Sequence, residues 1–169
     1  MTKLMTIDSV LVRDFSKFGL LTPFLSLSST MQTSSTACDC IKIPHGVATY
    51  DGPVSGKLYM ATLTNEEFSE AFALGTDFKG LTCDDTTVLV LARRDGTILI
   101  TGDSRMYRVA ASLNITVHNY QWAFNEMVEA GILSKSEAKN KYNLLATSVN
   151  KYTDWKEPAH ALKAAYLDY

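Results

Sequence analysis

The chain has 169 residues, a formal net charge of −2 and 46% hydrophobic residues. These values are typical of one globular domain, and they argue against a protein that binds nucleic acid through phosphate contacts alone, which is usually strongly basic. No apolar run approaches the roughly 20 residues that cross a bilayer, and the first residues lack the apolar core of a signal peptide. The three cysteines, an odd number, favour free thiols in a reducing compartment. We therefore expect a cytoplasmic protein with no membrane partner.

The N-terminal part of the chain is predicted to form strands and two short helices. Residues 5–8 are typical of a short buried strand that ends on a carboxylate. The apolar spacing over residues 10–27 predicts two helices, with Gly19 and Pro23 as breaks. Residues 26–36, rich in Ser and Thr, predict a loop with a strand inside it.

Two helix starts in the middle of the chain carry a capping-box pattern. In each, a threonine is followed three residues later by an acid: Thr64 by Glu67, and Thr82 by Asp85. The β-branched residues 86–88 leave a strand open as the alternative for the second segment. The acids at its start and the glycine after it favour a helix.

Strands alternate with helices in the rest of the chain. The predicted strands are 57–63, 97–101 and 115–117, and the predicted helices are 105–113, 122–130, 134–146 and 158–167. The strand at 97–101 is a continuous apolar run, as expected for a parallel sheet covered on both faces. The alternation predicts an open α/β fold, in which ligands bind beyond the carboxyl ends of the strands.

Three aspartates far apart in the sequence are predicted to meet at that edge. Asp8 and Asp103 each come just after a predicted strand, and Asp85 lies at a helix N-terminus, where carboxylates are favoured. Taken singly, each aspartate also fits an ordinary turn or cap residue. Mg²⁺ and Mn²⁺ prefer oxygen ligands, and packed carboxylates repel one another unless a cation lies between them. As a group, the three are candidates for a divalent-metal site.

A cysteine pair with a nearby histidine raises zinc as an alternative metal. Cys38, Cys40 and His45 supply three suitable side chains. A structural zinc site needs four ligands, and neither His118 nor His160 is clearly placed to be the fourth. Buried free thiols are therefore the favoured interpretation.

Several charged residues beside the predicted site have two interpretations. Arg105, two residues after Asp103, is either a contact to the substrate backbone or an ordinary exposed side chain. Arg93 and Arg94 are best explained as cations at a helix C-terminus. Asp84 is interpreted as an exposed charge at a helix N-terminus rather than as a further acid of the site.

Two ordered motifs resemble the PIN-domain nucleases. Residues 81–92 (Leu-Thr-Cys-Asp-Asp-Thr-Thr-Val-Leu-Val-Leu-Ala) resemble the Leu-Ser-x-x-Asp helix start of that family. Residues 98–105 (Ile-Leu-Ile-Thr-Gly-Asp-Ser-Arg) resemble its strand that ends in Leu-Leu-Thr-(Gly/Asp)-Asp before basic residues. Further similar segments are residues 7–9, 14–21 and 110–134. The similarity extends from residue 6 to about residue 146 and is weakest over residues 39–80.

The resemblance implies a fold and a set of site residues. It implies a three-layer α/β/α domain over residues 1–150, with a central, mostly parallel sheet, and a helical tail over residues 151–169 that packs on the same domain. It makes the three aspartates the metal-binding and catalytic acids. Thr101 becomes a supporting hydroxyl near the metal that, with Arg105, contacts the substrate. The glutamate that the family usually carries falls on Cys40, or under another alignment near Asp51.

The resemblance also implies a function. Many PIN-domain proteins are Mg²⁺- or Mn²⁺-dependent ribonucleases, often the toxin half of a toxin–antitoxin pair. It therefore predicts an endoribonuclease with an RNA substrate, an antitoxin protein as partner and, by analogy, a homodimer. One alternative is a catalytically impaired PIN-like domain that acts as a protein- or nucleic-acid-binding module. Another is an α/β protein that binds a phosphorylated small molecule through magnesium.

Overall fold

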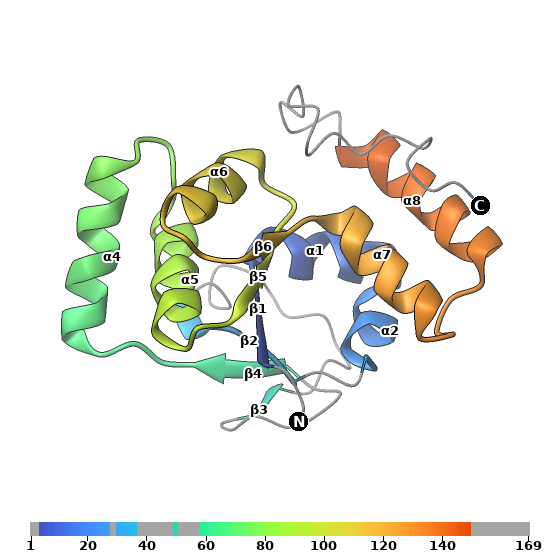
Figure 1. Ribbon diagram of the computed structural model, residues 1–169, viewed down its shortest axis with the longest axis horizontal. Coiled ribbons are helices and arrows are strands. Elements are labelled where there is room, and N and C mark those ends of the chain that lie inside the picture. Colours follow the sequence, from blue (N-terminus) through green and yellow to red (C-terminus); the bar gives the residue numbers. More distant parts are fainter. Residues whose placement is uncertain (1–3, 28–29, 37–48, 51–57, 150–169) are drawn as a thin grey trace.

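The computed structural model describes residues 4–27, 30–36, 49–50 and 58–149 (Figure 1). The strands are β1 (Leu4–Ile7), β2 (Thr30–Ser34), β3 (Thr49–Tyr50), β4 (Leu58–Ala61), β5 (Ile98–Ile100) and β6 (Val117–His118). The helices are α1 (Ser9–Lys17), α2 (Leu21–Leu25), α4 (Asn65–Asp77), α5 (Cys83–Arg94), α6 (Ser104–Ser112), α7 (Tyr120–Glu129) and α8 (Lys135–Val149). The predicted helix at 158–167 and the predicted tail at 151–169 lie outside the described residues.

The described strands form one sheet in the order β3-β4-β2-β1-β5-β6, and every pairing in it is parallel. β1 is central: Met5 pairs with Met31 on β2 and with Ile98 on β5. From β1 the chain moves outward to β2 and then to β3 at the edge, inserts β4 between these two, and returns to add β5 and β6 on the other side. The order of the strands therefore reverses between β1 and β5, which is where open α/β sheets bind ligands at their carboxyl edge.

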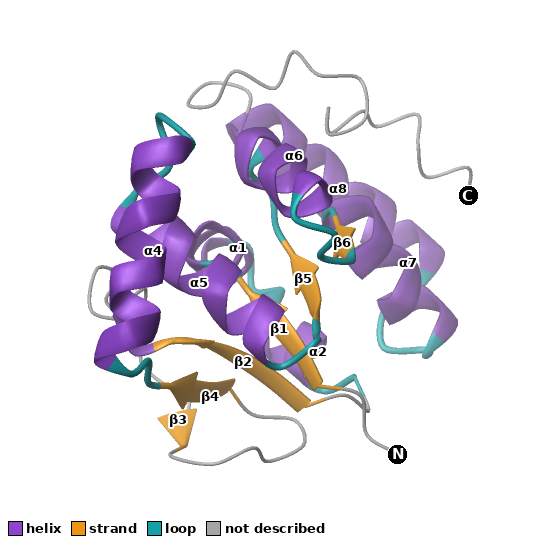
Figure 2. Cartoon of the chain, turned by 60° about the vertical axis from the view of Figure 1, so that its left-hand side comes forward, coloured by secondary structure: helices purple, strands orange, loops and turns teal. Residues whose placement is uncertain are grey.

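Helices cover both faces of the sheet. Figures 1 and 2 show α4 and α5 on one side of the strands and α7 and α8 on the other. The side chains divide in the same way, because successive residues of a strand point to opposite faces. Ile98 and Ile100 pack with α1, α2, α7 and α8, whereas Leu99 packs with α4, α5 and α6. This arrangement confirms the predicted three-layer α/β/α fold with a parallel sheet.

Aromatic side chains hold together the layer made of α1, α2, α7 and α8. The ring of Phe15 on α1 lies 5.3 Å from that of Phe24, 5.2 Å from that of Tyr120 and 5.9 Å from that of Phe124, measured between centroids. Phe124 in turn meets Tyr142 on α8 at 5.3 Å. All five rings are buried. Edge-to-face pairs of this kind add to the free energy of burial. They hold α1, and with it the residues at its N-terminus, against α2 and α7.

Most elements predicted within the described residues are present, and most differences lie at their ends, although β3 was not predicted. The segment after Thr82 is a helix, so the strand alternative is wrong. Pro23 was predicted to be a break but lies inside α2, in the first turn, where a missing N–H costs no intrahelical bond. β6 begins at Val117, later than predicted. α7 begins at Tyr120, earlier than predicted, because Asn119 caps it.

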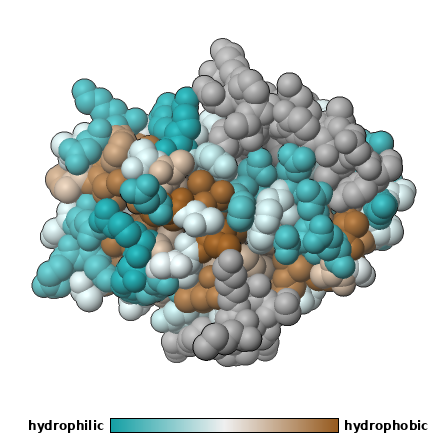
Figure 3. Space-filling model, viewed as in Figure 1, coloured by the Kyte–Doolittle hydropathy of each residue, from teal (hydrophilic) through white to brown (hydrophobic). Residues whose placement is uncertain are grey.

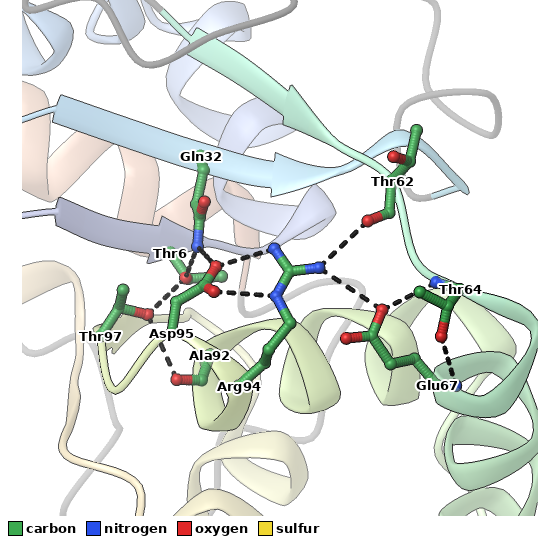
Figure 4. A network of polar contacts seen from close by, with 9 residues as sticks. All are labelled: Thr6, Gln32, Thr62, Thr64, Glu67, Ala92, Arg94, Asp95 and Thr97. Carbon is green, nitrogen blue, oxygen red and sulfur yellow. Dashed lines mark hydrogen bonds and ion pairs between the residues drawn. The ribbon is translucent and has the colours of Figure 1, made fainter.

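The C-terminus of α5 is tied to the sheet by a polar network (Figure 4). Gln32 on β2, only 1% exposed, donates from Nε2 to Asp95 Oδ2 at 2.8 Å and to Thr6 Oγ1 at 3.1 Å. Thr6 also bonds Thr97 at 2.6 Å. Arg94 donates from Nε and Nη2 to the two oxygens of Asp95, at 2.8 and 2.9 Å. Burial alone raises the pKa of Asp95, but the bonds from Arg94 and Gln32 outweigh it and hold that pKa below its usual value.

The same arginine joins α5 to the start of α4. Arg94 Nη1 donates to the carbonyl of Thr62 at 3.1 Å and lies 3.4 Å from Glu67 Oε2. Glu67 and Thr64 form the predicted capping box, with the Thr64 N–H donating to Glu67 Oε2 at 2.7 Å. Arg93 and Arg94 occupy the last turn of α5, which confirms their prediction as C-terminal cations.

Three large apolar side chains stay exposed in the described part of the chain. They are Phe68 and Phe72 on α4, at 38% and 79%, and Leu144 on α8, at 60%. Figure 3 shows apolar surface over α4, at the left of that view, among larger polar areas. Within the described residues, every helix is too short or too polar to cross a membrane.

Candidate functional site

Asp8 is the first residue after β1 and caps α1. Its Oδ1 accepts the N–H of Leu11 at 2.7 Å, and its Oδ2 accepts the hydroxyl of Thr101. Only 1% of Asp8 is exposed. A carboxylate so deeply buried is costly unless it is hydrogen-bonded or paired with a positive charge.

Asp103 lies beside Asp8 because β5 neighbours β1 in the sheet. It caps α6, and its Oδ1 accepts the N–H of Met106 at 2.7 Å. Its own N–H donates to Thr101 Oγ1 at 3.0 Å. The Thr101 hydroxyl therefore links the two acids, donating to one residue and accepting from the other.

Asp85 comes to the same edge from the N-terminus of α5. Its Oδ2 accepts the N–H of Thr82 at 2.7 Å, and its own N–H donates to Thr82 Oγ1 at 3.2 Å. This is the predicted capping box. The neighbouring Asp84, predicted to be an exposed charge at the helix N-terminus, is half-buried.

A pocket of about 350 Å³ opens at this edge. It is lined by Ser9, Val10, Arg13, Gly80, Thr82, Asp84, Asp85 and Asp103. Two of the three predicted acids, Asp85 and Asp103, thus face one pocket, together with Asp84. Asp8 is buried beside it, bonded to the residues that follow β5.

Burial and neighbouring charges act on two of the three aspartates. Burial raises the pKa of Asp8 to about 7; the bonds from Thr101 and Leu11 oppose this rise, and the charges of Asp85 and Asp103 add to it. Burial also raises the pKa of Asp85, with bonds from Thr82 opposing and the charges of Asp103 and Asp84 adding. Without a cation, burial and the neighbouring charges therefore disfavour the charged forms of Asp8 and Asp85.

The donor chemistry fits a hard cation, although the arrangement does not form a closed metal site. Within the described residues, no three His, Cys, Asp or Glu side chains are grouped to hold one ion. Asp85 and Asp103 each use one oxygen as a helix cap, and Asp85 Oδ1 and Asp103 Oδ2 take no part in those bonds. Two such oxygens with added water suit magnesium, which keeps several waters when protein ligands are few.

Arg105 contacts the rim of the pocket. Its Nη1 donates to the carbonyl of Gly80 at 2.8 Å, and its side chain is exposed. Gly80 lines the pocket with φ at +91°, a conformation that favours glycine. Arg105 itself is not among the described lining residues, so its predicted contact with substrate stays a prediction.

Gly102, between Thr101 and Asp103, is packed too tightly for any side chain. A Cβ there would overlap the phenol ring of Tyr120. We expect Gly102→Ala to lower the free energy of unfolding by about 1–3 kcal/mol, because the buried ring would have to move. Denaturant unfolding measures this, with Gly75→Ala as a control at a position without a positive φ where a Cβ would make only an ordinary contact. Equal or smaller loss in Gly102→Ala would contradict the close approach.

Sequence reasoning missed Arg13 in the pocket wall and the buried pair Asp14–Tyr120. Tyr120 donates its hydroxyl to Asp14 Oδ2 at 2.9 Å, and both residues are buried. One signal was available: Asp14 lies between Leu11 and Phe15 on the apolar face of its predicted helix. A charge on such a face requires a buried partner. No local feature of the sequence identifies Tyr120 as that partner.

Some predicted site residues lie outside the described residues. These are Cys38, Cys40 and His45 of the zinc alternative, and Cys40 and Asp51 as candidate positions for the family's glutamate. Cys83, at the start of α5, is an exposed free thiol. The structure therefore tests neither the zinc alternative nor the fourth acid.

No protein-family model matches the chain, and no curated protein matches it. The resemblance to PIN-domain nucleases accordingly stays a prediction.

Proposed function

We propose that the chain is a metal-dependent phosphodiester hydrolase, an endoribonuclease of the PIN-domain toxin type. The observation that carries the proposal is a pocket at the reversal point of a parallel sheet, lined by Asp85 and Asp103, with Asp8 buried beside it. Burial raises the pKa of Asp8 and of Asp85, and the charges of neighbouring aspartates add to the rise in each. Carboxylates gathered in this way are costly by themselves and become favourable around a divalent cation.

The aspartates have different roles in this proposal. Asp85 and Asp103 offer their uncapped oxygens to Mg²⁺ or Mn²⁺ in the pocket. Asp8 accepts a hydrogen bond from Thr101, lies buried beside the pocket, and adds negative charge that attracts the cation. The bound cation would supply a nucleophilic water and neutralise charge on the phosphodiester. Thr101 holds Asp8 and Asp103 close to each other, because its hydroxyl forms hydrogen bonds with both residues.

The choice of RNA and the choice of partners rest on the resemblance. The two motifs around Asp85 and Asp103 support a ribonuclease, with an antitoxin protein as partner and a homodimer as assembly. The proposed cytoplasmic location rests instead on the three cysteines, an odd number that favours free thiols in a reducing compartment. None of these follows from the fold, which hosts many chemistries.

The test is cleavage of a mixed RNA pool by the purified protein with Mn²⁺ or Mg²⁺. We expect metal-dependent cleavage that EDTA abolishes and that Asp85→Asn loses. Asparagine keeps an oxygen for the capping bond with Thr82, so the variant should fold. No cleavage by folded wild-type protein, with either metal, would refute the proposal.

A binding module is the second candidate function. It is favoured by the finding that no three metal-ligating side chains are grouped among the described residues. Calorimetric titration with Mn²⁺ separates the two candidates. Saturable binding supports the nuclease, and no detectable heat at any concentration supports a PIN-like domain that acts through contacts alone.

A further inference from the structure

Arg13 is the basic side chain in the described wall of the acidic pocket. It lies on α1, in the turn after the Asp8 cap, and 59% of its side chain is exposed. The other charged residues of that wall are Asp84, Asp85 and Asp103. A phosphodiester that enters this pocket would therefore meet repulsion from three acids and attraction from one arginine.

A hydrogen bond to its neighbour orients the Arg13 side chain. Arg13 Nε donates to Asp14 Oδ1 at 3.0 Å. Asp14 is only 6% exposed, and its other oxygen accepts the Tyr120 hydroxyl at 2.9 Å. Burial and the charges of Asp14 and Asp8 raise the pKa of Tyr120 well above its ordinary value, so the phenol keeps the proton that it donates. Arg13 is thus held by a chain of two buried groups that begins in the aromatic core.

The geometry leaves the outer edge of the guanidinium available. Nε faces Asp14, and neither Nη nitrogen has a partner among the described residues. Paired N–H groups on one edge of a guanidinium match two oxygens of a phosphate. An arginine whose side chain is already ordered also loses less entropy when it binds.

We propose that Arg13 binds a backbone phosphate of RNA at the acidic pocket, and that Asp14 and Tyr120 are positioning residues that hold it there. This inference rests on the proposed function, because it needs RNA as the ligand. The competing explanation is a purely structural ion pair between Arg13 and Asp14. With an arginine so exposed, such a pair contributes little to stability.

The test is binding of a fluorescein-labelled single-stranded RNA, measured by fluorescence anisotropy over a range of salt concentrations with Mn²⁺ present. The parent is the Asp103→Asn protein, which is expected to leave the RNA uncut. Arg13→Gln should raise Kd about tenfold and reduce the slope of log Kd against log salt by about one. Arg13→Lys should restore the salt slope but not the full affinity, because the lysine ammonium cannot form the two parallel hydrogen bonds that a guanidinium makes to a phosphate.

Two further variants test the positioning role. Asp14→Asn and Tyr120→Phe should raise Kd by a smaller factor and leave the salt slope unchanged, because Arg13 keeps its charge. Arg93→Gln, at the far end of α5 from the pocket, is the matched control and should bind as the parent does. Thermal melting of every variant identifies any that fail to fold. If Arg13→Gln does not fold, the affinity of Arg13→Lys still tests the phosphate contact.

The outcomes separate this inference from the proposed function. If the wild type cleaves RNA and the Arg13 variants bind like the parent, Arg13 is only a structural partner of Asp14 and the nuclease stands. If the parent binds no RNA and the wild type cleaves none, both proposals fall. A loss of affinity in Arg13→Gln with an unchanged salt slope would overturn the phosphate contact, because lost charge must reduce the slope.

Discussion

Asp103→Asn is expected to lower the rate of RNA cleavage by at least about a hundredfold while the melting temperature stays nearly unchanged. Removing one carboxylate from around a catalytic cation withdraws several kcal/mol of charge stabilisation from the transition state. The fold should tolerate the change, because asparagine is as good a helix cap as aspartate and retains an oxygen for the Met106 N–H. Initial cleavage rates with Mn²⁺ and thermal melts of the same samples measure both effects.

Asp95→Asn is the matched control, and it should lower stability without lowering activity. Asp95 caps the other end of α5, where its carboxylate takes two bonds from Arg94 and one from Gln32. An asparagine there loses the charge and one acceptor oxygen, so the melting temperature should fall while cleavage by the folded protein persists. Full activity in Asp103→Asn would remove Asp103 from the site. Equal losses of activity in both variants would mean that cleavage reports folding alone.

The parts of the site that could be predicted from the sequence are those with a local pattern. Thr82 and Asp85 form a capping box whose two members lie within one helical turn, so their spacing alone predicts it. Asp8 and Asp103 could be placed because each follows an apolar strand, and parallel strands bring their carboxyl ends to one edge. That β1 and β5 are direct neighbours could not be read from either strand, since pairing joins segments far apart in the chain.

The parts that could not be predicted depend on long-range packing. Tyr120 lies far along the chain from Asp14, yet its hydroxyl bonds that carboxylate and its ring fills the space beneath Gly102. Likewise, nothing in the sequence around Asp95 indicates that Gln32 of β2 donates a hydrogen bond to its carboxylate. Buried polar groups must find partners, but their sequence does not say which partners. The same limit explains why Arg13 was missed.

Asp8→Asn should make the metal-free protein more stable than the wild type, by a margin that grows as the pH rises from about 4 to 7. The pKa of Asp8 is about 7 in the folded protein, against 3.8 for the ordinary group. Between these values the folded state holds a proton that the unfolded state has released, so wild-type stability falls with rising pH. The shift of about three pKa units corresponds to about 4 kcal/mol as an upper limit. The raised pKa of Asp85 acts in the same direction in both proteins.

Denaturant unfolding in EDTA at several pH values, repeated with Mn²⁺, measures this effect. Asparagine keeps an oxygen for the Leu11 N–H, so the cap of α1 survives and the difference reports the lost charge. A cation that binds the aspartates stabilises their charged forms and favours the folded state, so Mn²⁺ should restore wild-type stability near pH 8 more than that of the variant. Parallel pH profiles would show that Asp8 carries no raised pKa. Equal stabilisation by Mn²⁺ would show that the cation, wherever it binds, does not interact with Asp8.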